Sequence, residues 1–149
     1  MSNKDITKDL GIYWPQNKKM KIPRILDKYT ILKRIAETNS AVVVSAKMKN
    51  SSSKFAIKCI PIDFYENYKN EMDFFAVNTH PNIIECIESF KYPPTKARFY
   101  AIVMPCAIRD MVKYLEFHHY IEEPLSCTIM REILSAVQYF HARDIIHRD

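Results

Sequence analysis

The sequence predicts an α+β fold in which a five-stranded antiparallel sheet carries one helix after its third strand and leads into further helices. Short runs of β-branched and apolar residues, separated by polar turn-like segments, predict the strands. An apolar stripe at helical spacing after the third run predicts the first helix. Two more helical patterns then close the chain.

The predicted strands are short, and the first three are joined by short connections. Glu-Thr-Asn-Ser at residues 37–40 is typical of a turn, and a polar, serine-rich loop precedes the third strand. Short connections of this kind favour antiparallel neighbours. The five strands are expected at residues 29–35, 42–46, 53–60, 83–90 and 99–104.

Pro61 is expected to end the third strand, and a helix follows it. Asp63 can cap the N-terminus of this helix, with Glu66 reaching back in a capping box. Glu71 lies at the margin of the apolar stripe, from which it can lean toward the sheet, and the helix stops before Pro81. The stripe consists of Phe64, Tyr68, Met72 and Phe75.

Beyond the sheet, residues 109–118 predict a short helix, and Pro124 is expected to begin a longer one. The apolar face of the longer helix consists of Leu125, Ile129, Ile133, Val137 and Phe140. No later element in these residues would cover that face, so we expect it to be exposed.

Composition excludes several classes of function. The chain has 149 residues, 48% of them hydrophobic, and its net charge of +5 is spread along the chain, which argues against nucleic-acid binding. Four cysteines without CxxC spacing predict buried, reduced thiols in an intracellular, cytoplasmic protein. The sequence contains neither a membrane-spanning run nor a signal-peptide core, so no membrane partner is expected.

The third strand has two unlike faces. Because side chains alternate along a strand, Ala56 and Lys58 share one face while Phe55 and Ile57 share the other. A small side chain beside a cation suits a flat ligand with a negatively charged tail. The plainer alternative is that Lys58 is only a solvated residue on a surface strand.

These motifs together resemble the small lobe of a eukaryotic protein kinase followed by the start of the large lobe. Residues 55–58 (Phe-Ala-Ile-Lys) are similar to the V-A-I-K motif, and residues 146–149 (Ile-His-Arg-Asp) to the start of the catalytic loop. Glu71, ahead of His-Pro-Asn-Ile at residues 80–83, occupies the place of the regulatory-helix glutamate. The resemblance divides the chain into a polar leader (1–24), an N-lobe (25–104), a hinge (105–108) and the start of a C-lobe (109–149).

The resemblance implies a role for each matching residue. Lys58 would hold the α- and β-phosphates of ATP, and Glu71 would hold Lys58 extended. Asp149 would orient the substrate hydroxyl and accept its proton, so Lys58 and Asp149 are the candidate catalytic residues. The candidate ATP-binding residues are Ile35, Val43, Ala56, Lys58, Glu71, Met104 at the gatekeeper position, Cys106 and Ala107.

The sequence departs from the family in two places. Residues 36–43 replace the glycine-rich loop and keep its valine but none of its three glycines. Each lost glycine and the charge of Glu37 should loosen the grip on phosphates, at about 1 kcal/mol per glycine. The residues that hold Mg²⁺ in the family would also lie beyond Asp149, so we expect these 149 residues alone not to transfer phosphate.

Two functions therefore stay open. The first is a protein kinase domain of the Ser/Thr type that uses ATP and Mg²⁺ to phosphorylate protein hydroxyls, here in truncated form. The second is a pseudokinase-like binding module or scaffold without catalysis. The expected partners are ATP and a protein substrate or partner protein, with no nucleic acid and no membrane.

Overall fold

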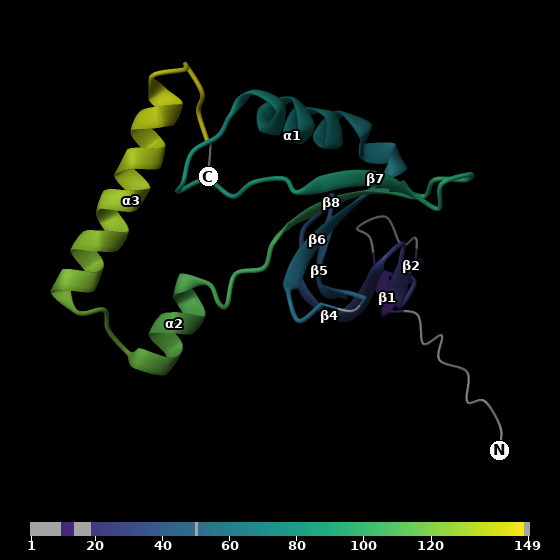
Figure 1. Ribbon diagram of the computed structural model, residues 1–149, viewed down its shortest axis with the longest axis horizontal. Helices are drawn as coiled ribbons and strands as arrows, with labels where there is room; N and C mark the ends of the chain where they lie inside the picture. Colours follow the sequence, from purple (N-terminus) through teal and green to yellow (C-terminus); the bar gives the residue numbers. More distant parts are fainter. Residues whose placement is uncertain (1–9, 14–18, 50, 148–149) are drawn as a thin grey trace. The chain divides into compact units, whose positions relative to one another are not determined.

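A computed structural model describes residues 10–13, 19–49 and 51–147, with side chains from Ile22 onward. Its elements, labelled in Figure 1, are β1 (Leu10–Tyr13), β2 (Lys19–Ile22), β3 (Ile25–Leu26), β4 (Tyr29–Glu37), β5 (Val42–Met48), β6 (Lys54–Pro61), a 3-10 helix (Ile62–Phe64), α1 (Tyr65–Val77), β7 (Glu88–Tyr92), β8 (Phe99–Pro105), α2 (Met111–His118) and α3 (Glu123–His141).

The chain forms two compact units, each described here by itself. The first contains residues 1–77 and 85–106, and the second contains residues 78–84 and 107–149. The boundaries expected for a leader and a hinge stay predictions.

The predicted fold class is confirmed. All five predicted strands belong to one antiparallel sheet with the order β3-β4-β5-β6-β8-β7, and the two-residue strand β3 adds a sixth at the β4 edge. A separate two-stranded sheet, β1 and β2, lies in the segment expected to be a polar leader. The strands form there although the segment contains few of the residues that favour strands, because pairing and context can outweigh the intrinsic preference of single residues.

Two local predictions were wrong. The strand expected at residues 83–90 begins at Glu88, because the chain first makes a turn in which the Ile83 amide donates to the His80 carbonyl over 3.0 Å. Asp63 does not cap α1. It lies within the 3-10 helix, whose N-cap is Pro61 without a side-chain hydrogen bond.

Each face of the sheet has its own apolar cluster. One face joins buried residues of β4, β5, β6 and β8, among them Ile57, Cys59 and Val103, to Ile22 and Leu26. The other carries Ala41, Ile60, Tyr100, Ile102 and Met104. The alternation predicted along β6 is confirmed, since Ile57 and Ile60 belong to opposite clusters.

The helix α1 covers the second of these faces, along β7 and β8 (Figure 1). The predicted stripe is the contacting surface, because Phe64, Tyr68, Met72 and Phe75 all pack on this cluster. The ring of Tyr68 stacks on that of Tyr100 with centroids 4.1 Å apart. The register of α1 against the sheet is therefore set by large apolar contacts.

The sheet is strongly rolled, because side chains join strands that are far apart in the strand order. Tyr29 of β4 donates a hydrogen bond to Glu88 of β7, and its ring stacks with Phe90 at a centroid separation of 6.5 Å. Lys28 donates to the other carboxylate oxygen of Glu88 over 2.9 Å. Burial raises the pKa of the Tyr29 phenol, and the neighbouring Glu88 raises it further.

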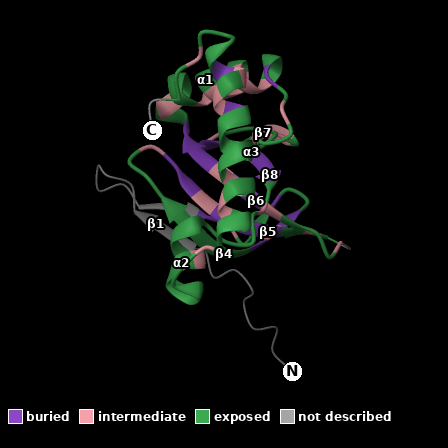
Figure 2. Ribbon diagram, turned by 90° about the vertical axis from the view of Figure 1, so that its left-hand side faces the viewer, coloured by how far each residue is buried: buried purple, intermediate pink, exposed green. Residues whose placement is uncertain are grey.

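The second unit is held together by contacts between residues 78–84 and α3. The Thr79 amide donates to the Tyr139 hydroxyl over 3.2 Å, and the Asn82 side chain donates to the Glu132 carbonyl over 3.0 Å. His80 Nε2 lies 3.2 Å from Ser135 Oγ. Much of α3 is exposed, as Figure 2 shows, including Leu125 (41%) and Ile133 (49%) of the predicted apolar face. The expected exposure is wrong for the rest of that face, since Ile129 and Val137 are half-buried and Phe140 is buried.

The contact of Glu88 with Tyr29 and Lys28 predicts a pH-dependent contribution to stability. Burial raises the pKa of Glu88, but the hydrogen bonds from Tyr29 and Lys28 and the charge of Lys28 outweigh it, so the net pKa is lowered. A carboxyl group with a lowered pKa stabilises the fold above its unfolded pKa, ordinarily 4.5, and the contribution disappears as the pH falls below that value.

We therefore expect Glu88→Gln to lower the free energy of unfolding by about 1 kcal/mol near neutral pH. The difference from the parent chain should shrink as the pH falls below 4.5, as measured by urea denaturation across a pH series. Glu85→Gln, at an exposed position nearby, is the control. If the difference in the free energy of unfolding between Glu88→Gln and the parent chain did not vary with pH, the stabilising role of the charged Glu88 carboxylate would be contradicted.

Candidate functional site

The candidate site is built on the face of β6 that α1 covers. In the pairing of β6 with β8, Ala56 lies opposite Met104 and Lys58 opposite Ile102. On the other side of β6, Val43 of β5 lies opposite Lys58. Directly opposed residues project to the same face of a sheet, so Val43, Ala56, Lys58 and Met104 share one surface.

Lys58 and Glu71 meet on this surface, since the Lys58 ammonium donates a short hydrogen bond to the Glu71 carboxylate. The side chains are 27% and 30% exposed, so water still reaches the pair. Partly solvated ion pairs contribute little to stability, typically about 1 kcal/mol or less. The geometric effect is larger, because the contact holds a long, flexible side chain in one direction over the sheet.

The apolar part of the surface is small and close-packed. Ala56 is 8% exposed and Met104 is 9% exposed, whereas Val43 is half-buried. Ala56 presents only a methyl group beside the ammonium of Lys58. A small apolar surface beside a cation suits the ligand expected from the sequence, which is flat and has a negatively charged tail.

The remaining predicted residues are less closely associated with this surface. Ile35 is 40% exposed and lies in a β-bulge between Arg34 and Ala36. Cys106 follows β8 and is half-buried, and the exposed Ala107 belongs to the second unit. Asp149 lies outside the described residues. The functional roles of all these residues stay predictions.

The turn between β4 and β5, which replaces the glycine-rich loop, is closed by a threonine. The Thr38 amide donates to the Ala41 carbonyl over 2.8 Å, and the Ala41 amide donates to Thr38 Oγ1 over 3.1 Å. Within the described chain, a positive φ occurs only at Asp27, His119 and Asp144, so this turn needs no glycine. Ala41 itself is 1% exposed.

The charge of Glu37 is also partly neutralised, because Arg34 donates to its carboxylate over 2.6 Å. Sequence reasoning counted Glu37 as a free negative charge and missed both contacts. Residues three apart on a regular strand project to opposite faces, so their spacing did not indicate the Arg34–Glu37 contact, which the β-bulge between Arg34 and Ala36 makes possible. A signal was present in Thr38, whose hydroxyl can bond to nearby backbone groups.

The cysteines differ in their surroundings, and none of the four is in a disulfide. Cys59 is completely buried, and burial strongly raises the pKa of its thiol, which keeps the thiol protonated. Burial, together with the charge of Glu88, raises the pKa of the half-buried Cys86. Cys127 is exposed on α3, contrary to the expectation that all four would be buried.

The described residues contain no cluster of three or more potential metal ligands. Among the helices of the described segments, none has the length and apolar character needed to traverse a bilayer.

Comparison with known proteins gives one consistent family. The model of the protein kinase domain matches residues 29–149. The serine/threonine-protein kinase fused of Drosophila melanogaster is 28% identical over 129 residues, which cover 83% of this chain and 16% of that protein. Testis-specific serine/threonine-protein kinase 2 of Mus musculus is 30% identical over 128 residues, covering 81% of this chain and 35% of that protein.

A structural comparison shows which solved structure has a similar fold. Rad53 residues 1–466, solved in complex with AMP-PNP, matches with a TM-score of 0.67 at 23% identity, covering 82% of this chain and 32% of that one. The chain thus spans only 16% to 35% of the length of the similar proteins named here.

The threonine-closed turn leads to a direct test. Thr38→Val keeps the β-branched shape but removes the hydroxyl acceptor, so the Ala41 amide should exchange its hydrogen about fivefold to tenfold faster. Amide exchange followed by NMR measures this, with ladder amides of β5 as the internal reference. Thr30→Val on β4 is the matched control. Unchanged exchange at Ala41 would show that the hydroxyl does not close the turn.

Proposed function

The chain belongs to the protein kinase family, and from this premise we propose that its first unit binds ATP on the face of β6 that carries Ala56 and Lys58. The single observation that supports this most directly is the contact between Lys58 and Glu71. A lysine held extended by a helix-borne carboxylate presents a fixed positive charge to phosphate oxygens. The methyl of Ala56 and the side chains of Val43 and Met104 offer an apolar surface that suits an adenine ring.

The residues present fit the nucleotide on this face of the sheet. Lys58 would contact the α- and β-phosphates, and Glu71 would keep its ammonium in place. Ile35 and the backbone of Cys106 and Ala107 would complete the contacts to the base. Mg²⁺ would neutralise phosphate charge, with ligands that follow Asp149 in the family pattern.

We further propose that the family activity, phosphoryl transfer to serine or threonine hydroxyls of proteins, is the function of the protein to which this sequence corresponds. Both relatives described above are named as serine/threonine kinases. Asp149 would orient the substrate hydroxyl and accept its proton.

A second candidate function is a binding module without catalysis. The turn at Thr38–Ala41 favours this reading, because two of its amides already bond within the turn and its tip contains side chains in place of glycines. The two functions differ in their response to metal. Stabilisation by ATP that requires Mg²⁺ supports a working kinase site, whereas no stabilisation by ATP supports a scaffold.

The nucleotide site is tested by thermal unfolding of the purified chain with increasing ATP. A ligand at 100 times its Kd stabilises the fold by about 2.7 kcal/mol, which raises Tm by several degrees. Lys58→Met should lower ATP affinity about tenfold or more, because the charge that meets the phosphates is lost. Glu71→Gln should cause a smaller loss, because Lys58 keeps its charge but loses its anchor.

Lys54→Met is the matched control, since Lys54 lies at the exposed start of the same strand. It should leave the response to ATP unchanged. Equal losses for Lys54→Met and Lys58→Met would indicate non-specific attraction between ATP and a basic chain and would refute the proposed site.

A further inference from the structure

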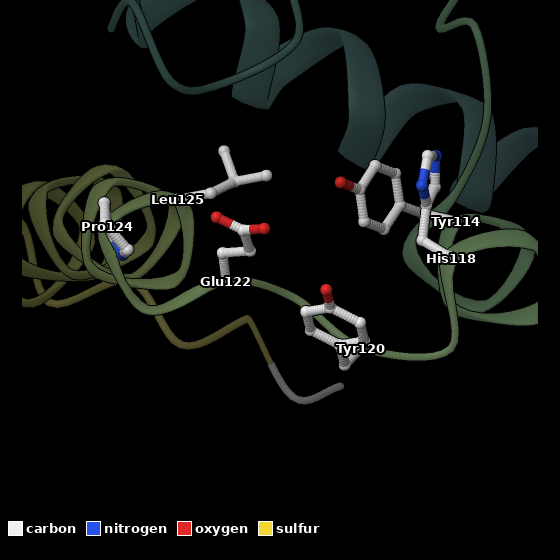
Figure 3. A pocket seen from close by; sticks show the side chains of 6 residues that line it. All are labelled: Tyr114, His118, Tyr120, Glu122, Pro124 and Leu125. Carbon is white, nitrogen blue, oxygen red and sulfur yellow. The ribbon is translucent and has the colours of Figure 1, made fainter.

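A pocket of about 300 Å³ lies in the second unit, where the chain passes from α2 to α3. We call it the α2–α3 pocket; Figure 3 shows the residues that line it, Tyr114, His118, Tyr120, Glu122, Pro124 and Leu125. All six belong to the second unit, whereas Lys58 belongs to the first.

The two helix ends shape the wall of the pocket. The helix α2 ends at His118, and its C-cap residue, His119, has a left-handed backbone (φ 65°) and donates its amide to the Leu115 carbonyl over 2.7 Å. One turn apart on α2, the rings of Tyr114 and His118 stack with centroids 4.3 Å apart. This stack gives the α2 side of the pocket a flat aromatic wall.

The opposite side is provided by the start of α3. Glu122 is the N-cap residue of this helix, yet its side chain makes no capping hydrogen bond. In Figure 3 the Glu122 carboxylate and the hydroxyls of Tyr114 and Tyr120 face a common space beside Leu125. The polar atoms that converge there are therefore a carboxylate and two phenol oxygens, all able to accept hydrogen bonds.

The electrostatics of the pocket select a cation. Glu122 carries the one carboxylate among the lining residues, which include no lysine or arginine, although the whole chain has a net charge of +5. The imidazole of His118, the titratable nitrogen-bearing side chain of the lining, is stacked on Tyr114. The basic residues of the neighbouring segment are directed elsewhere. Arg109 and Lys113 line a separate hollow with Glu116 and Phe117, and the Lys113 ammonium bonds to Asp110 over 2.7 Å.

We propose that the α2–α3 pocket binds an arginine side chain of a partner protein. A guanidinium group has donors in a planar fork that can bond to the Glu122 carboxylate and the tyrosine oxygens. Its flat face stacks on aromatic rings, and its aliphatic stem can lie against Leu125 and Pro124. A compact ammonium ion lacks the planar face and the fork of donors, so it would match the aromatic wall and the three separate oxygen-bearing groups less well. The pocket would therefore recognise a segment of the partner protein that contains an arginine.

The test measures fluorescence anisotropy of a labelled pentapeptide, Leu-Ala-Arg-Ala-Leu, titrated with the purified full chain. The comparison peptide carries citrulline in place of arginine, which keeps the shape and removes the charge. We expect the arginine peptide to bind and the citrulline peptide to bind at least about tenfold more weakly, in line with the loss of a charge-assisted hydrogen bond.

Two matched variants locate the binding. Glu122→Gln should weaken the arginine peptide about threefold to tenfold, whereas Glu123→Gln, which changes the adjacent carboxylate outside the pocket lining, should not. Thermal unfolding of both variants verifies that they fold alike. Equal weakening by both variants, equal binding of both peptides, or no binding of the arginine peptide would each overturn the proposal.

Discussion

The contact between α1 and the β6–β8 face is the interaction on which the candidate site depends. Glu71 can reach Lys58 only while Phe64, Tyr68, Met72 and Phe75 hold the helix on the sheet. The ion pair itself is about 30% exposed and adds little to stability. Complete burial of one large apolar side chain stabilises by about 1.5–3 kcal/mol, so even the partial burial of these four outweighs the ion pair. The apolar stripe therefore fixes the position of the helix, and the position of Glu71 follows from it.

Strand alternation imposes a second constraint on the same site. Because β6 lies inside the sheet, between β5 and β8, its side chains must serve two different clusters. Ile57 and Cys59 fill one of them, which leaves the opposite face for Ala56 and Lys58. A one-residue shift in the register of β6 would place Lys58 among buried apolar residues, where an unpaired charge is very costly. The apolar pattern of β6 therefore fixes the register of the strand and, with it, the face on which Lys58 lies.

Local periodicity made the sheet and the stripe of α1 predictable from sequence, because each follows from spacing within one or two elements. The pairing of Lys58 with Glu71 was implied by the resemblance to protein kinases and not by spacing. Features that depend on particular side-chain bonds were not predictable. The closure of the β4–β5 turn depends on the rotamer of Thr38, and the contact of Tyr29 with Glu88 joins positions 59 residues apart. The pocket beside α2 and α3 likewise requires the backbone turn at His119, which no spacing rule indicates.

The Tyr29–Glu88 bond also affects how the sheet meets other chains. Strands at the border of a sheet expose unpaired backbone groups and can recruit further strands, which leads to aggregation. This bond connects β4 to the edge strand β7 and so keeps the sheet rolled. A rolled sheet pairs less readily with a strand of another molecule than a flat one does. A substitution that removes the Tyr29 hydroxyl would thus have two effects. It would remove the bond to Glu88, and it would make the edge strand more accessible to β-pairing with neighbouring molecules.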